Sequence, residues 1–234
     1  MTPRGANLSL FITFEGVEGS GKTTQIQRLK RYLKRRGVSC KVTREPGGPP
    51  ISEKIRKILL DPNHRKLIPL SELLLYEAAR AQHIHEVIKP LLKKGTIVLC
   101  DRFNDATLAY QGYGRKIDRE LIRKLNRLSS QGIKPDLTFL LDCPSDLGLK
   151  RALQRNRLSR NEKEGRFERE KIQFHHRVRK GYLAIAKKEP HRVKVIDTRV
   201  GEEKAFEKIR KIVDELLVRS SPACRTGRES GVRS

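Results

Sequence analysis

A glycine-rich turn between an apolar run and a helical pattern limits most strongly how this 234-residue chain can fold. Residues 16–23 read GVEGSGKT and match the pattern G-x-x-x-x-G-K-[ST]. The apolar run 10–14 before them predicts a buried strand, and apolar spacing over 22–36 predicts a helix. In this context backbone N–H groups and the helix N-terminus face a phosphate, while Lys22 supplies a cation and Thr23 a hydroxyl for Mg²⁺. The motif therefore predicts a phosphate-binding loop, or P-loop.

Strand and helix patterns alternate along the whole chain. Short apolar runs rich in β-branched and aromatic residues predict five buried strands, at 10–14, 38–42, 96–100, 137–141 and 193–196. Helical spacing occurs at 22–36, 51–60, 71–93, 118–131, 145–155, 168–187 and 202–217. This succession predicts an α/β protein of the P-loop NTPase class, with a five-stranded parallel sheet in a three-layer α/β/α fold. Ligands should then bind at the carboxyl ends of the strands.

Length and composition predict one domain. A hydrophobic content of 36% is enough for a single core, which we assign to residues 1–217, and the basic, polar segment 218–234 is expected to be a disordered tail. No apolar run reaches the roughly 18 residues of a membrane span, and the run 8–14 is too short for a signal peptide. We therefore expect a cytoplasmic protein. The four cysteines have no metal-ligand spacing, so we expect neither zinc nor disulfides.

The net charge of +25 comes from 52 Lys and Arg against 27 Asp and Glu, and it favours polyanionic partners such as nucleotides or nucleic acid. A nucleic-acid-binding P-loop protein is therefore one alternative. The chain lacks the interleaved aromatic residues and the recognisable binding motif of such proteins, so nucleic acid is not required. It also lacks the N-K-x-D pattern with which GTPases read guanine.

Two charged residues follow the predicted strand 96–100. Asp101 stands where a Walker-B-type carboxylate holds Mg²⁺ or its waters, opposite the P-loop hydroxyl of Thr23. Arg102 comes next, and a planar guanidinium can bind two phosphate oxygens at once. The dipeptide alone could be a solvated ion pair, but with a P-loop upstream the metal and phosphate roles are favoured. We predict Mg²⁺ as cofactor, held by Thr23 and Asp101, with ATP as co-substrate.

Four blocks in order resemble the bacterial type of thymidylate kinase, a family of P-loop nucleoside monophosphate kinases. They are FEGVEGSGKTT at 14–24, TREPGG at 43–48, DRF at 101–103 with LAYQG at 108–112, and PDL at 135–137. The resemblance covers roughly residues 8–217. It implies a phosphotransferase that moves the γ-phosphoryl group of ATP to dTMP, giving dTDP and ADP for dTTP biosynthesis, and a homodimer. A kinase for another nucleoside monophosphate is the alternative, against which TREPGG and the YQG segment argue.

The resemblance also implies roles for individual residues. The residues that bind ATP would be Gly16, Val17, Glu18, Gly19, Ser20, Gly21, Lys22, Thr23 and Thr24. The residues that bind the acceptor would be Glu18, Arg44, Tyr76, Arg80, Arg102, Thr107, Tyr110, Gln111 and Glu168. Without the resemblance, Tyr76 would be interpreted as a core residue and Arg80 as a solvated helix charge.

The resemblance implies contacts to three parts of the acceptor nucleotide: its phosphate, its sugar and its base. Arg102 would grip the acceptor phosphate. Glu18 would face the acceptor, where it can accept a hydrogen bond from the 3′-hydroxyl, and Tyr110 would crowd the sugar 2′ position. The thymine ring would stack on Tyr76. Arg80 would bind its exocyclic oxygen, and Thr107 and Gln111 would line its pocket.

The P-loop has no arginine at its variable positions, so the cation that meets the charge on the transferred group must come from elsewhere. The basic segment 155–168 resembles the family's lid. Its arginines include Arg155, and the candidate catalytic residues are Lys22, Asp101, Arg102, Arg157, Arg160 and Arg166. The sequence does not rank the last three, and a solvated or nucleic-acid-binding loop is the alternative. Gly165 stands where many relatives have Asp, which leaves Glu168 as the acidic residue of this segment.

Overall fold

The computed structural model describes residues 9–159 and 165–219. The prediction for Arg160 and almost all of the predicted tail, residues 220–234, therefore lie outside the described residues. Across the described ranges, no helix combines the length and the apolar character that crossing a membrane requires.

Five strands form one parallel sheet in the order β2-β3-β1-β4-β5. They are β1 (Phe11–Glu15), β2 (Cys40–Arg44), β3 (Ile97–Asp101), β4 (Leu137–Asp142) and β5 (Val193–Asp197). The predicted five-stranded parallel sheet is confirmed. The expected burial of every strand is wrong for β2, which lies at one edge of the sheet and is only partly buried. Every strand ends on a charged residue, one or two positions later than the apolar runs predicted. A charged residue ends an apolar run in the sequence, but its backbone can still hydrogen-bond to the neighbouring strand. Charged side chains are thus carried at the carboxyl edge of the sheet.

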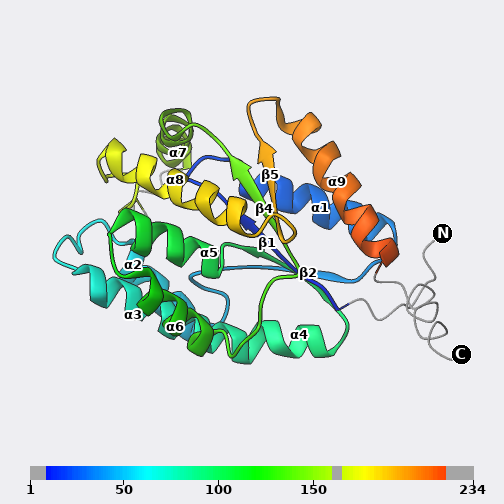
Figure 1. Cartoon of the computed structure of the whole chain (residues 1–234), viewed down its shortest axis with the longest axis horizontal. Coiled ribbons are helices and arrows are strands. Elements are labelled where there is room, and N and C mark those ends of the chain that lie inside the picture. Colours follow the sequence, from blue (N-terminus) through cyan, green and yellow to red (C-terminus); the bar gives the residue numbers. More distant parts are fainter. Residues whose placement is uncertain (1–8, 160–164, 220–234) are drawn as a thin grey trace, which may run out of the picture.

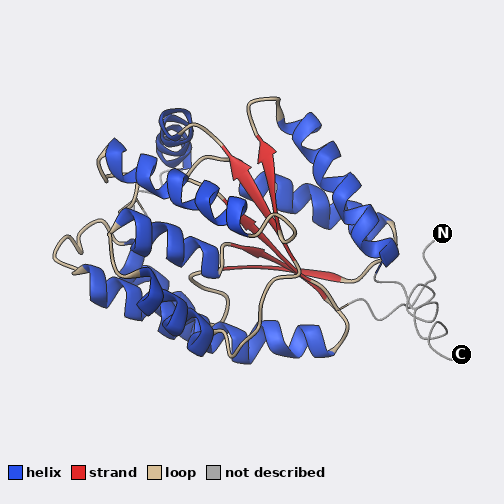
Figure 2. Ribbon diagram, viewed as in Figure 1, coloured by secondary structure: helices blue, strands red, loops and turns tan. Residues whose placement is uncertain are grey.

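Helices cover both faces of the sheet, as Figures 1 and 2 show. On one face α1 (Lys22–Arg35) and α9 (Glu202–Arg219) pack together against the strands. This part of the core contains Ile26, Leu29 and Leu33 of α1, Phe206, Ile209 and Val213 of α9, and Ile12, Phe14, Leu99 and Phe139 of the sheet. On the other face lie α3 (Pro69–His83), α6 (Arg119–Ser129) and α8 (Ile172–Lys188), and α2 (Pro50–Leu60) packs against α3. The three-layer prediction is confirmed.

Several helical segments differ from the expected ones. The predicted helix 71–93 is α3, a π-helical segment (Ile84–Ile88) and α4 (Lys89–Lys93), and α8 begins at Ile172 rather than at residue 168. Helix α7 (Ser145–Ser159) runs beyond residue 155, so the start of the predicted lid is helical. Two segments were not predicted, α5 (Asn104–Thr107) and the π-helical segment η2 (Leu108–Gly114). The glycines of η2 weaken its helical signal in the sequence.

Two glycines bring η2 and α8 into close contact. A Cβ on Gly181 of α8 would lie 2.7 Å from the Tyr113 ring, and a Cβ on Gly114 would lie 2.6 Å from the Phe174 ring. Since neither distance is possible for a real side chain, both positions need glycine. The close approach sets Tyr110 of η2 beside Tyr182 of α8, with ring centroids 6.2 Å apart.

Candidate active site

One cleft of about 1110 Å³ lies at the carboxyl edge of the sheet. Its wall contains P-loop residues Glu18 to Thr24 together with Asp101. All the residues that the sequence assigned to the acceptor also line it: Glu18, Arg44, Tyr76, Arg80, Arg102, Thr107, Tyr110, Gln111 and Glu168. Segments far apart in the sequence therefore meet around one space large enough for two nucleotides.

The P-loop is closely packed at two glycines. Gly16 has φ 137°, and a Cβ there would lie 2.5 Å from the Leu141 carbonyl oxygen. Gly19 has φ 67°, and a Cβ there would lie 2.0 Å from the carbonyl oxygen of Gly148 in α7. Both positions thus require glycine for conformation and for space. The contact with Gly148 also holds α7, the helix that leads into the predicted lid, against the loop.

Lys22 begins α1 and its side chain turns back under the loop. Its ammonium group donates hydrogen bonds to the carbonyl oxygens of Gly16 (3.1 Å) and Val17 (3.0 Å). Burial, followed by the nearby Arg102, lowers the pKa of Lys22 to about 8, although the carboxylate of Asp101 acts to raise it. A desolvated cation at this point interacts strongly with any phosphate that enters the loop.

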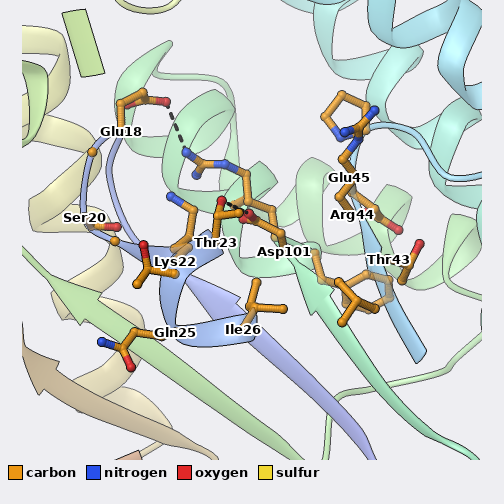
Figure 3. A pocket seen from close by; sticks show the side chains of 18 of the residues that line it. Glu18, Ser20, Lys22, Thr23, Gln25, Ile26, Thr43, Arg44, Glu45 and Asp101 are labelled. Atoms are coloured by element: carbon orange, nitrogen blue, oxygen red, sulfur yellow. Dashed lines mark hydrogen bonds and ion pairs between the residues drawn. The ribbon is translucent and has the colours of Figure 1, made fainter. Parts of the chain in front are cut away.

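Thr23 and Asp101 meet across the cleft floor. The Thr23 hydroxyl donates to Oδ2 of Asp101 at 3.3 Å, and Figure 3 shows the pair beside Lys22. A hydroxyl and a carboxylate are hard oxygen donors, which Mg²⁺ prefers, and this ion commonly takes its other ligands from water and substrate phosphates. The two residues therefore fit the predicted metal.

The Glu18 side chain lies in the P-loop and is 11% exposed. Its Oε1 accepts hydrogen bonds from Nη2 of Arg102 (3.1 Å) and from the Tyr110 hydroxyl (2.5 Å), and its Oε2 lies 3.5 Å from Nδ1 of His175. Burial acts to raise the pKa of Glu18, but His175, Arg102, Lys22 and Tyr110 outweigh it and hold this pKa far below its usual range. Glu18 is therefore ionised. Its Oε2 accepts no hydrogen bond from the described part of the chain.

Arg80 is 1% exposed, which rules out the interpretation as a solvated helix charge. Its guanidinium donates to the carboxylates of Glu45 (2.8 Å) and Glu77 (3.0 Å), and to Asn126 (2.6 Å) and Thr107 (2.9 Å). These four partners fix its orientation in the cleft wall.

The neighbouring side chains give the same region both an aromatic face and fixed polar groups. Tyr76 is half-buried and lines the cleft, with its ring centroid 6.5 Å from that of Phe167. Gln111 is buried and donates to Oε1 of Glu72 at 2.9 Å. The predicted base-binding residues thus share one wall.

Comparison with known proteins agrees with this geometry. A family model described as thymidylate kinase matches residues 14–209. The chain belongs to the thymidylate kinase family.

Relatives match over most of their length. A thymidylate kinase of Geobacter sulfurreducens is 56% identical over 196 residues, which cover 84% of this chain and 92% of the relative. One from Syntrophotalea carbinolica is 56% identical over 190 residues, covering 81% and 88%. The crystal structure of thymidylate kinase from Ehrlichia chaffeensis superimposes with a TM-score of 0.72 at 39% identity, covering 88% of this chain and 99% of that one. The family resemblance seen in the sequence is confirmed.

Two arginines of the predicted lid segment, Arg157 and Arg166, lie in different surroundings. Arg157 is exposed, and neither it nor Arg166 is among the described residues of the cleft wall. Arg166 is buried, and it donates to the Leu59 carbonyl (2.5 Å) and to Glu72 (2.6 Å). Their catalytic role stays a prediction.

Arg155, the first arginine of the predicted lid segment, does line the cleft from α7, as does Arg151 one helical turn before it. Arg155 lies 3.7 Å from Glu168, a carboxylate whose pKa is raised by burial and then by Glu18. Arg151 belongs to none of the sequence motifs. Its i,i+4 spacing from Arg155 on a predicted helix was the available signal, since residues four apart share a helix face.

Proposed function

We propose that this chain is a thymidylate kinase that transfers the γ-phosphoryl group of ATP to dTMP and forms dTDP and ADP. The observation that carries the proposal is that a P-loop and a complete set of acceptor residues line one cleft, in a chain of the thymidylate kinase family. Family membership favours dTMP over other nucleoside monophosphates and favours an enzyme over a nucleic-acid-binding protein. A cytoplasmic location and a homodimer remain predictions from the sequence.

On the donor side, the P-loop amides bind the β- and γ-phosphates and the Lys22 cation meets their charge. Thr23, at the start of α1, and Asp101, at the carboxyl end of β3, would hold Mg²⁺. When bound, this ion neutralises charge on the phosphate oxygens. The short separation between the two side chains supports this pairing.

On the acceptor side, Arg102 binds the dTMP phosphate through its planar guanidinium. Glu18 accepts a hydrogen bond from the sugar 3′-hydroxyl. The ionised state of Glu18 supports this role. Tyr110, held by its bond to Glu18, occupies the space next to the sugar 2′ position.

For the base, Tyr76 provides the stacking face and Arg80 binds an exocyclic oxygen, with Thr107 and Gln111 completing the pocket. Arg80 is immobilised by its protein partners, so its direction is set before the base binds, which lowers the entropy cost of recognition. Arg44 is also in the cleft wall, on the acceptor side in this assignment.

The negative charge that develops on the transferred phosphoryl group is met by an arginine of the predicted lid segment. Arg155 of α7 already lines the cleft and joins Arg157, Arg160 and Arg166 as a candidate. A guanidinium from a mobile segment can contribute on the order of 10³-fold to phosphoryl transfer.

The proposal is tested by product analysis with ATP, dTMP and Mg²⁺. We expect dTDP and ADP in equal amounts, and removal of Mg²⁺ with EDTA should lower the rate by at least about a hundredfold. Asp101→Asn should lower the rate about tenfold at low Mg²⁺ and recover in part when Mg²⁺ is raised, because metal affinity is what it loses. Asp146→Asn, at an exposed carboxylate of α7, is the matched control. ADP release without dTDP, or a rate insensitive to EDTA, would contradict the proposal.

A further inference from the structure

Arg102 has an unusual backbone conformation that turns its side chain toward the P-loop. Its φ is 70°, in the left-handed region that residues other than glycine seldom adopt. Its N–H donates to the carbonyl oxygen of Phe14 at 3.0 Å. The next N–H, that of Phe103, donates to Oε1 of Glu15 at 2.7 Å. The last residue of β1 thus helps to hold the strained turn that follows β3.

The other oxygen of Glu15 reaches the side chain of Arg102 through one hydroxyl. Nη1 of Arg102 donates to the Tyr182 hydroxyl at 3.0 Å and to the Gly16 carbonyl at 3.0 Å. The Tyr182 hydroxyl in turn donates to Oε2 of Glu15 at 2.8 Å. Glu15 therefore holds the turn at Arg102 from two directions, through the N–H of the next residue, Phe103, and through the Tyr182 hydroxyl at the Arg102 guanidinium.

Neither supporting side chain is among the described residues of the cleft wall. Glu15 is 0% exposed and Tyr182 is 2% exposed. Burial, and then the nearby Asp105, raises the pKa of Glu15 to about 8 even though Arg102 acts to lower it. Burying an ionisable group costs folding free energy unless hydrogen bonds or a paired charge compensate for the lost hydration. One bond of Glu15 holds the backbone N–H of Phe103, next to Arg102, and the other leads through the Tyr182 hydroxyl to the Arg102 guanidinium.

We propose that Tyr182 and Glu15 are positioning residues for Arg102, which they aim at the phosphate of the acceptor. This inference rests on the proposed function, because that function makes Arg102 the phosphate-binding group. Since Tyr182 lies on α8, the helix that follows the lid segment, it links that helix to the acceptor phosphate site.

The test is Tyr182→Phe, which removes the hydroxyl and keeps the ring in its aromatic cluster. We expect kcat/KM for dTMP to fall about tenfold, with KM for ATP changing less than about twofold, because the loss falls on the acceptor phosphate. Tyr32→Phe is a matched control. Its hydroxyl accepts from Arg36 (2.9 Å) and donates to Asp214 (2.7 Å), the same arrangement placed between α1 and α9. This variant should keep wild-type kinetics.

A double-mutant cycle separates positioning from a merely structural role. In an Arg102→Lys background, Tyr182→Phe should lower kcat/KM for dTMP by less than about twofold more, because the group that it positions is already gone. Glu15→Gln places an amide NH2 at one of the two positions where Phe103 N–H and the Tyr182 hydroxyl now find an acceptor oxygen, so it should behave like Tyr182→Phe. An equal tenfold loss in the Arg102→Lys background, or wild-type kinetics for Tyr182→Phe, would overturn the inference. If the wild-type enzyme makes no dTDP, it is the proposed function that fails.

Discussion

Lys22→Ala is expected to lower kcat/KM by at least about a thousandfold, with either substrate varied. Lys22 places a desolvated cation where we propose that the phosphates of ATP bind. In a water-poor cleft its interaction with a phosphate is much stronger than in bulk solvent. Its protein contacts are two loop carbonyls, so the variant should unfold within a few degrees of the wild type. Steady-state kinetics and thermal unfolding check both statements.

The control for this variant is Lys30→Ala, which removes an exposed lysine from the same helix. It should leave kinetics and stability close to those of the wild type. A folded Lys22→Ala enzyme with near-normal turnover would rule out the assignment of residues 16–23 as the ATP phosphate site.

Arg102→Ala is expected to lower kcat/KM for dTMP by at least about a hundredfold while changing KM for ATP less than about threefold. The guanidinium can bind two phosphate oxygens at once, and no Ala variant can replace that charge. Arg102→Lys should recover part of the loss, since a point charge does not reproduce the planar fork. Calorimetric titration with dTMP and kinetics with each substrate varied measure the two effects separately.

The matched control is Arg123→Ala, which removes an arginine paired with Glu120 on the surface of α6. It should behave as the wild type. If Arg102→Ala raised KM for ATP as much as KM for dTMP, Arg102 would belong to the donor side and the acceptor assignment would be wrong.

The strands were predictable because each contains a short run of mostly apolar residues between charged residues or turns, although β2, at the edge of the sheet, is only partly buried. The charged last residues of the strands were not predictable. Glu15 and Asp101 belong to the sheet only because their backbones pair with neighbouring strands. The π-helical segment η2 was missed for a similar reason. Its glycines oppose helix formation locally, and its packing against α8 compensates for them.

In the site, residues carried by local motifs were predictable and those brought in by tertiary contacts were not. Lys22 and Thr23 are part of the P-loop motif, and Asp101 comes directly after a predicted strand, so the sequence alone indicates their roles. His175 and Tyr182 lie within a helical pattern that predicts packing, and their approach to Glu18 and Arg102 depends on how α8 crosses the sheet. No spacing rule contains that information.

The most direct test of the account is the acceptor preference of the purified enzyme, measured as kcat/KM for a panel of nucleoside monophosphates with ATP and Mg²⁺. The cleft wall offers Tyr76 as a stacking face and Arg80 in a fixed direction, which together suit one small pyrimidine base. We expect dTMP to be the best acceptor and dUMP to be poorer by about tenfold, because the thymine methyl group fills apolar space. CMP, GMP and AMP should be poorer still. Equal or better kcat/KM with any of these three would contradict the assignment of dTMP as the substrate.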